Sequence, residues 1–67
     1  MAELSNRVRE AREARGWTQA QLAERIGVSR KTVNTVENGV FVPSTIVALK
    51  LAAALETPVE TLFSLIE

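Results

Sequence analysis

The sequence predicts an all-α fold, a compact five-helix domain that contains a helix-turn-helix. Two observations support this prediction: apolar residues recur at helical spacing along the chain, and helix-start residues alternate with helix-ending glycines. No strand-like alternation is long enough to compete with the helical pattern. At 67 residues, the chain is expected to form a single domain over residues 1–67.

The length also limits the size of the core. A domain of this size buries only about 60% of the surface that its unfolded chain exposes. The chain has no cysteine and no histidine, so disulfides and the usual zinc sites are excluded, and we predict neither a metal nor another cofactor. Good packing or oligomerisation must therefore stabilise the fold, and we expect a homodimer.

The sequence pattern predicts a cytoplasmic protein, and the distribution of charge predicts one side that faces phosphate. No apolar run approaches a membrane span, and residues 1–10 lack the pattern of a signal peptide, so we expect a soluble chain without a membrane partner. The formal net charge is zero, but residues 1–31 carry seven basic and four acidic side chains, whereas residues 32–67 carry one basic and four acidic. Such asymmetry suits a nucleic-acid partner on one side.

The first two helices have clear boundaries. The apolar spacing predicts a first helix from Ser5 to Arg15, after which Gly16 ends it. Thr18 is placed to cap the second helix, with Gln21 as the other half of a capping box. Gly27 ends the second helix, because it can adopt a positive φ in a tight turn.

The third helix begins after a cap at Ser29 and ends at Asn38–Gly39. Val33 and Val36 face inward on this helix. Its outward face is polar and carries no carboxylate; that face comprises Arg30, Lys31, Asn34, Thr35 and Asn38.

The last two helices are predicted from a cap at Ser44 through Leu55 and from a capping box at Thr57–Glu60 onward. The buried positions expected in the fourth helix are Ile46, Leu49, Ala52, Ala53 and Leu55. The fifth helix carries an apolar stripe wider than a small monomer needs, and we predict that residues 55–67 pair across a two-fold axis. The predicted dimer interface consists of Leu62, Phe63, Leu65 and Ile66.

Residues 18–38 have the spacing of a helix-turn-helix. Counting from Gln19, a small residue stands where the two helices cross (Ala23), and a glycine stands at the turn (Gly27). Val33 and Val36 then supply the inner face of the second helix. Two short helices joined by a three-residue glycine turn are typical of proteins that place the second helix in the major groove of DNA.

The segment Trp17–Gly39 resembles the Cro and phage-repressor family, also called the xenobiotic-response-element (XRE) family. Pro43–Ser44 and the segment Thr57–Phe63 resemble it too, especially its short, single-domain bacterial or phage regulators. The resemblance implies a five-helix DNA-binding fold of the lambda-repressor type, which binds an inverted repeat near a promoter as a dimer.

The resemblance also implies roles for individual residues. Base edges in the major groove would be contacted by Arg30, Lys31, Asn34 and Thr35. Phosphates would be contacted by Thr18, Gln19, Ser29, Thr32 and Asn38. Asparagine can read adenine bidentately, and arginine or lysine can read guanine.

Glu37 needs a partner, because a carboxylate in the last turn of a helix opposes the helix dipole and would repel phosphate. The resemblance implies a partly buried salt bridge between Arg12 and Glu37, and we expect it to brace the third helix. The apolar loop Val40–Val42 lacks the basic residues that related proteins often have there, so we expect no DNA role for it beyond its backbone.

The sequence thus predicts a homodimeric repressor or autoregulator that binds double-stranded DNA, with RNA polymerase or another protein as a possible further partner. The alternative is an antitoxin, or another protein-interaction module of the same fold, that binds DNA secondarily. An enzyme is not expected, because the sequence offers no nucleophile and base that could form a catalytic site.

Overall fold

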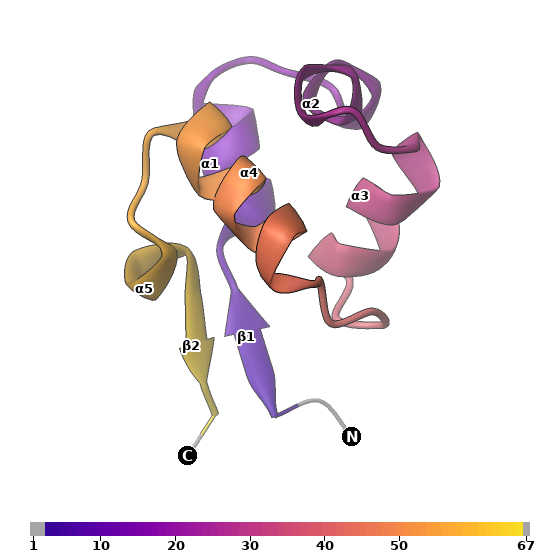
Figure 1. Ribbon diagram of the computed structural model, residues 1–67. Coiled ribbons are helices and arrows are strands. Elements are labelled where there is room, and N and C mark those ends of the chain that lie inside the picture. The colour runs from indigo at the N-terminus through magenta and orange to yellow at the C-terminus, as the bar shows by residue number, and fades with distance from the viewer. Residues whose placement is uncertain (1–2, 67) are drawn as a thin grey trace.

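The computed structural model describes residues 3–66 and shows five helices and one pair of short strands (Figure 1). The predicted five-helix fold is confirmed, and the strand pair is an addition to it. In chain order the elements are β1 (Leu4–Asn6), α1 (Val8–Ala14), α2 (Gln19–Ile26), α3 (Arg30–Glu37), α4 (Thr45–Leu55), α5 (Val59–Leu62) and β2 (Phe63–Leu65).

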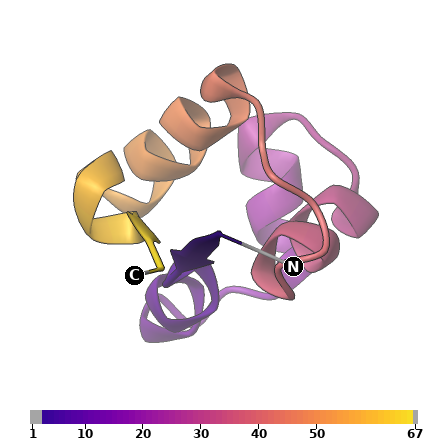
Figure 2. The ribbon, with the colours of Figure 1, turned by 90° about the horizontal axis from the view of Figure 1, so that it is seen from below.

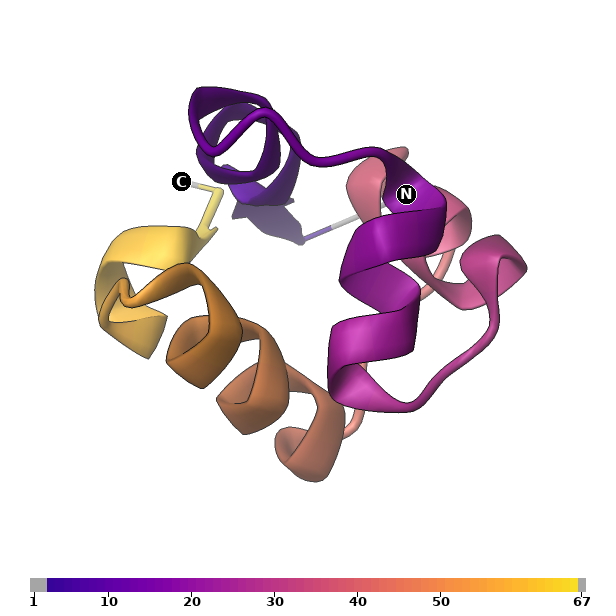
Figure 3. The ribbon, with the colours of Figure 1, turned by 90° about the horizontal axis from the view of Figure 1, so that it is seen from above.

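Views from below and above show the helices arranged in a ring (Figures 2 and 3). Their buried apolar side chains form one cluster, the hydrophobic core. Every element except β1 contributes to this core, whose buried side chains are Val8, Leu22, Ala23, Ile26, Val33, Val36, Leu51, Leu55, Leu62 and Phe63. None of the helices formed by residues 3–66 has the length and apolarity that a membrane crossing requires.

Three of the predicted helix starts are confirmed by their hydrogen bonds. Thr18 Oγ1 accepts from the backbone N–H of Gln21 at 3.1 Å, and the Thr18 N–H donates to Gln21 Oε1 at 2.8 Å, which completes the capping box. Ser29 and Ser44 cap α3 and α4 in the same way, each accepting a backbone N–H three residues on. These caps are local, so the sequence is sufficient to find them.

The predicted start of the first helix at Ser5 is wrong, because residues 4–6 form an antiparallel strand pair with residues 63–65 (Figure 1). Leu4 pairs with Leu65 and Asn6 with Phe63. The Asn6 side chain accepts the backbone N–H of Val8 at 3.1 Å, and α1 begins there. A strand of three residues is too short to show alternation, and its partner is 59 residues away.

The predicted long fifth helix is also wrong. α5 ends at Leu62 because Phe63 adopts an extended backbone, with φ −126° and ψ 140°, and enters the strand pair. The capping box predicted at Thr57–Glu60 is absent: Pro58 is the N-cap residue, and the Thr57 hydroxyl donates to the carbonyl of Leu55 at 3.0 Å.

The predicted buried face of α4 is wrong at three of its five positions. Ile46, Leu49 and Ala53 are exposed, whereas Leu51 and Leu55 are buried and Ala52 is half-buried. This helix is apolar on nearly all sides, so periodicity alone does not select the face that packs inward.

We predict that Glu56→Gly stabilises the chain. Glu56 follows α4 with φ 52°, a left-handed conformation that glycine adopts without strain. Its ion pair with Arg15 is 3.7 Å long and exposed, so its loss costs little. We expect a gain of about 0.5 to 1 kcal/mol in the free energy of unfolding, measured by urea denaturation.

The control for this substitution is Ala53→Gly, an exposed position inside α4. There the added backbone freedom should destabilise the helix by about 0.5 to 1 kcal/mol. Equal effects of the two substitutions would contradict the proposed strain at Glu56.

Candidate nucleic-acid interface

The helix-turn-helix is built from α2 and α3, which pack directly on each other. Gly27 ends α2 in the left-handed conformation, with φ 73°, and Ala23 of α2 is buried in the core. The N–H of Val28 donates back to the Ala23 carbonyl at 3.0 Å, which tightens the turn. The outer face of α3 is thereby held away from the core.

Three of the four predicted base-contacting residues are exposed on α3. Arg30, Lys31 and Asn34 line a shallow hollow of about 250 Å³. Their donor and acceptor groups suit the polar edges of bases. The outer face therefore offers two cations and an amide side by side.

Thr35, the fourth predicted base-contacting residue, has its hydroxyl turned to its own helix. Thr35 Oγ1 lies 3.0 Å from the carbonyl of Lys31 and 3.1 Å from that of Thr32, and it donates to one or the other. Ser29 and Thr32, predicted to contact phosphate, share a hydrogen bond of 2.9 Å between their hydroxyls. These three hydroxyls are engaged within α3 and its cap.

The remaining residues predicted to contact phosphate are Thr18, Gln19 and Asn38. Thr18 is exposed and caps α2. Gln19 is half-buried, and its amide accepts from Asn34 at 3.4 Å. Asn38 is exposed and donates to the carbonyl of Asn34 at 2.9 Å. Gln19 and Asn38 therefore each bond to Asn34 on the exposed face of α3.

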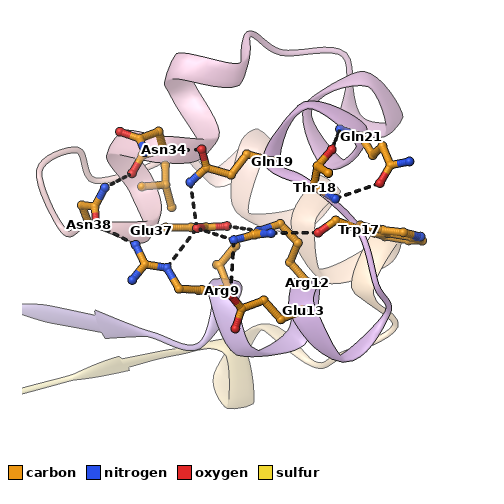
Figure 4. A network of polar contacts seen from close by, with 12 residues as sticks. Arg9, Arg12, Glu13, Trp17, Thr18, Gln19, Gln21, Asn34, Glu37 and Asn38 are labelled. Carbon is orange, nitrogen blue, oxygen red and sulfur yellow. Dashed lines mark hydrogen bonds and ion pairs between the residues drawn. The ribbon is translucent and has the colours of Figure 1, made fainter.

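A buried carboxylate lies at the centre of a polar network that joins α1, α2 and α3 (Figure 4). The Glu37 side chain has no solvent exposure, and its Oε2 accepts from Arg12 Nε at 2.7 Å. Its Oε1 accepts from Arg12 Nη2, from Gln19 Nε2 at 3.0 Å and from Arg9 Nε at 3.3 Å. The expected Arg12–Glu37 ion pair is thus present and has further donors around it.

This network sets the protonation of its members. Burial opposes ionisation of the Glu37 carboxyl, but the hydrogen bonds from Arg12, Gln19 and Arg9 and the charge of Arg12 outweigh it. The pKa of Glu37 is therefore lowered from its ordinary value. The hydrogen bond to Glu37 likewise raises the pKa of Arg12, against the effect of burial. Both groups are charged near neutral pH.

Two residues have contacts in this network that were not predicted from the sequence. Arg9 donates from Nη2 to Asn38 Oδ1 at 2.7 Å, in addition to its bond to Glu37. Asn6 donates to the carbonyl of Val36 at 2.9 Å and thereby ties β1 to the end of α3. Arg9 lies three residues before Arg12, so both side chains lie on one face of α1, but this spacing does not identify Glu37 as their shared partner. No local pattern signals that of Asn6.

The predicted dimer interface is divided by the fold. Leu62 and Phe63 are buried in the core of the chain itself, because α5 ends early and β2 turns back along β1. They are therefore not available to a partner, and this part of the prediction is wrong. Leu65 and Ile66 are exposed.

Residues 8–62 match the model of the helix-turn-helix family HTH_3. The chain belongs to this Cro/C1-type (XRE) helix-turn-helix family. Its members are DNA-binding regulators, and the family is not one of enzymes. The matched segment begins at the start of α1 and ends with α5.

Two bacterial proteins resemble the chain over most of its length. An uncharacterised HTH-type transcriptional regulator, YgzD of Bacillus subtilis, is 41% identical over 64 residues, which are 96% of this chain and 97% of the relative. The crystal structure of the restriction-modification controller protein C.AhdI from Aeromonas hydrophila has a TM-score of 0.77 and 40% identity. That match covers 82% of this chain and 83% of C.AhdI.

A more distant relative is antitoxin HipB of Escherichia coli, which is 33% identical over 54 residues. The match covers 81% of this chain and 57% of HipB. The proteins that resemble this chain therefore include transcriptional regulators and an antitoxin.

We predict that Glu37→Gln lowers the free energy of unfolding by about 3 kcal/mol at pH 7, because it leaves the nearly buried Arg12 without its counterion. The difference from the wild type should shrink as the pH falls below about 4.3, since the unfolded carboxyl then takes up a proton before the folded one does. Urea denaturation followed by Trp17 fluorescence measures both effects.

The control is Glu13→Gln, because Glu13 also faces Arg12, at 3.9 Å, but is largely exposed. This substitution should change the free energy of unfolding by less than about 0.5 kcal/mol. If both variants behaved alike, Glu37 would have no special role in the fold.

Proposed function

We propose that the chain is a homodimeric repressor or autoregulator that binds an inverted-repeat operator through α3. The observation that carries the proposal is the outer face of α3, where Arg30, Lys31 and Asn34 stand together and exposed. Glu37, the single carboxylate of this helix, is buried beneath Arg12 and Arg9 and does not repel phosphate. A neutral chain thus presents a locally cationic surface.

The helix N-terminus of α2 supports a phosphate contact beside this surface. Gln19 is the first residue of α2, and a helix N-terminus favours an anion because its N–H groups point outward. In the proposed complex, Gln19 and Asn38 bind phosphates on the two sides of α3, while Arg30, Lys31 and Asn34 read bases.

Binding as a dimer is proposed from the symmetry of inverted repeats and from exposed apolar side chains. Half-sites lie one helical turn, roughly 34 Å, apart, and the chain is 31 Å along its longest axis. Two copies side by side can therefore present their α3 helices at this spacing. Two exposed apolar pairs are candidates for the contact: Leu65 with Ile66 at the end of the chain, and Ile46 with Leu49 on α4.

The similarity to other regulators supports the regulatory role. C.AhdI is described as a restriction-modification controller protein, and YgzD as a transcriptional regulator. The match to antitoxin HipB favours a second candidate function, in which this chain neutralises a toxin and binds DNA secondarily. That second function would be favoured if an unrelated protein co-purified stably with the chain and if this protein covered α3 or competed with DNA for it.

Selection of bound duplexes from random DNA tests the proposed function. We expect the selected sequences to share an inverted-repeat consensus. Lys31→Ala and Asn34→Ala should each remove the base preference at one or two positions per half-site, and each lost preference corresponds to about 1 to 3 kcal/mol of binding free energy. Lys50→Ala is the matched control, because Lys50 is the other lysine of the chain and lies on α4. Uniform weakening by Lys31→Ala would make Lys31 a phosphate contact, and the absence of any consensus would refute the function.

Equilibrium sedimentation of Leu65→Ser and Ile46→Ser tests the dimer. We expect the wild-type chain to be a dimer at micromolar concentration and one of the two variants to be a monomer. The variant that dissociates identifies which apolar pair lies at the two-fold axis. Both side chains are exposed, so neither substitution should lower the melting temperature of the monomer. A wild-type chain that remains monomeric both free and on operator DNA would exclude the homodimer.

A further inference from the structure

A second hollow, of about 310 Å³, lies between α3 and the loop that follows it. Its lining consists of Ser29, Lys31, Thr32, Thr35, Val40 and Phe41. Four of these six residues belong to the set predicted to contact DNA. The hollow therefore continues the proposed interface, and Lys31 separates it from the polar hollow formed with Arg30 and Asn34.

The loop side of this hollow is held in place by backbone hydrogen bonds. The N–H groups of Val40 and Phe41 both donate to the carbonyl of Thr35, at 3.0 and 3.2 Å. Gly39, with φ 73°, makes the reversal that brings the loop back along α3. Phe41, about half exposed at 48%, is thus held beside α3.

The hollow is apolar because the hydroxyls that line it are already engaged. Ser29 and Thr32 bond to each other, and Ser29 also accepts the backbone N–H of Thr32. The Thr35 hydroxyl donates to a carbonyl of its own helix. What remains are the carbon surfaces of Val40 and Phe41, with Lys31 as the one charged residue of the lining.

We propose that this hollow receives the C5-methyl group of a thymine in the operator, and that Phe41 thereby determines specificity at that position. The inference rests on the proposed function. In the major groove, the methyl group of thymine is the distinctive apolar feature, and apolar side chains including phenylalanine recognise it. A protein partner is disfavoured, because the lining shares its residues with the DNA-binding face and includes a cation and no carboxylate.

The loop Val40–Val42 then has a side-chain role, in contrast to the expectation from sequence that only its backbone lies near DNA. Its lack of basic residues has a consequence of its own. A lysine at residue 41 would bind phosphate on any sequence, whereas a phenylalanine contributes only where a methyl group is present.

Replacement of thymine by deoxyuridine in the selected operator tests this proposal, because it removes only the methyl group. We expect one position per half-site at which the replacement weakens wild-type binding about fourfold, the factor for burial of one methyl group. In Phe41→Ala, the ratio of the affinity for the thymine operator to the affinity for the deoxyuridine operator should fall to about one. Operator binding itself should persist through Arg30, Lys31 and Asn34. Melting temperatures of the variants verify that they are folded.

Val42→Ala is the matched control, since Val42 is the next residue, is exposed and does not line the hollow. It should keep the wild-type ratio. An operator without any deoxyuridine-sensitive position, or an unchanged ratio in Phe41→Ala, overturns the inference and leaves the proposed function intact. A selection that yields no consensus overturns both.

Discussion

The buried carboxylate of Glu37 is the interaction on which the arrangement of the binding helices depends. It accepts from Arg12 and Arg9 of α1 and from Gln19 of α2, while it belongs to α3 itself. A buried charge is tolerated only when its partners are in place, so these donors keep the three helices in one relative orientation. The position of α3 at the surface therefore depends on an ion pair whose two side chains are almost fully buried. Figure 4 shows this pair among its neighbours.

The strand pair provides the second constraint, and it acts between the two ends of the chain. β1 and β2 pair with each other, and the Asn6 side chain extends from β1 to the carbonyl of Val36 in α3. This pairing moves Leu62 and Phe63 into the core, where a small domain gains most from additional apolar burial. The same pairing leaves Leu65 and Ile66 outside the core.

The surface of α3 combines a polar and an apolar hollow on the two sides of Lys31. Net charge does not reveal this surface, because the chain is formally neutral. What matters is that the one acidic side chain of α3 is turned inward and neutralised, while its cations stay outside. Local charge, and not the total, governs the approach of a phosphate backbone.

The sequence by itself determined the family, the five-helix fold, the helix starts at Thr18, Ser29 and Ser44, and the Arg12–Glu37 pair. The helix starts depend on contacts within one turn and the helix-turn-helix on a motif of fixed spacing, so both are present in the local order of residues. The Arg12–Glu37 pair joins residues 25 apart and was implied by the resemblance to the family. Only the tertiary structure decided the strand pair, the short α5, the face of α4 that packs inward and the role of Arg9. Each of these depends on contacts between segments that are far apart in the chain. Hydrophobic periodicity favours the alternative local conformations and helix faces almost equally, so only these long-range contacts select one of them.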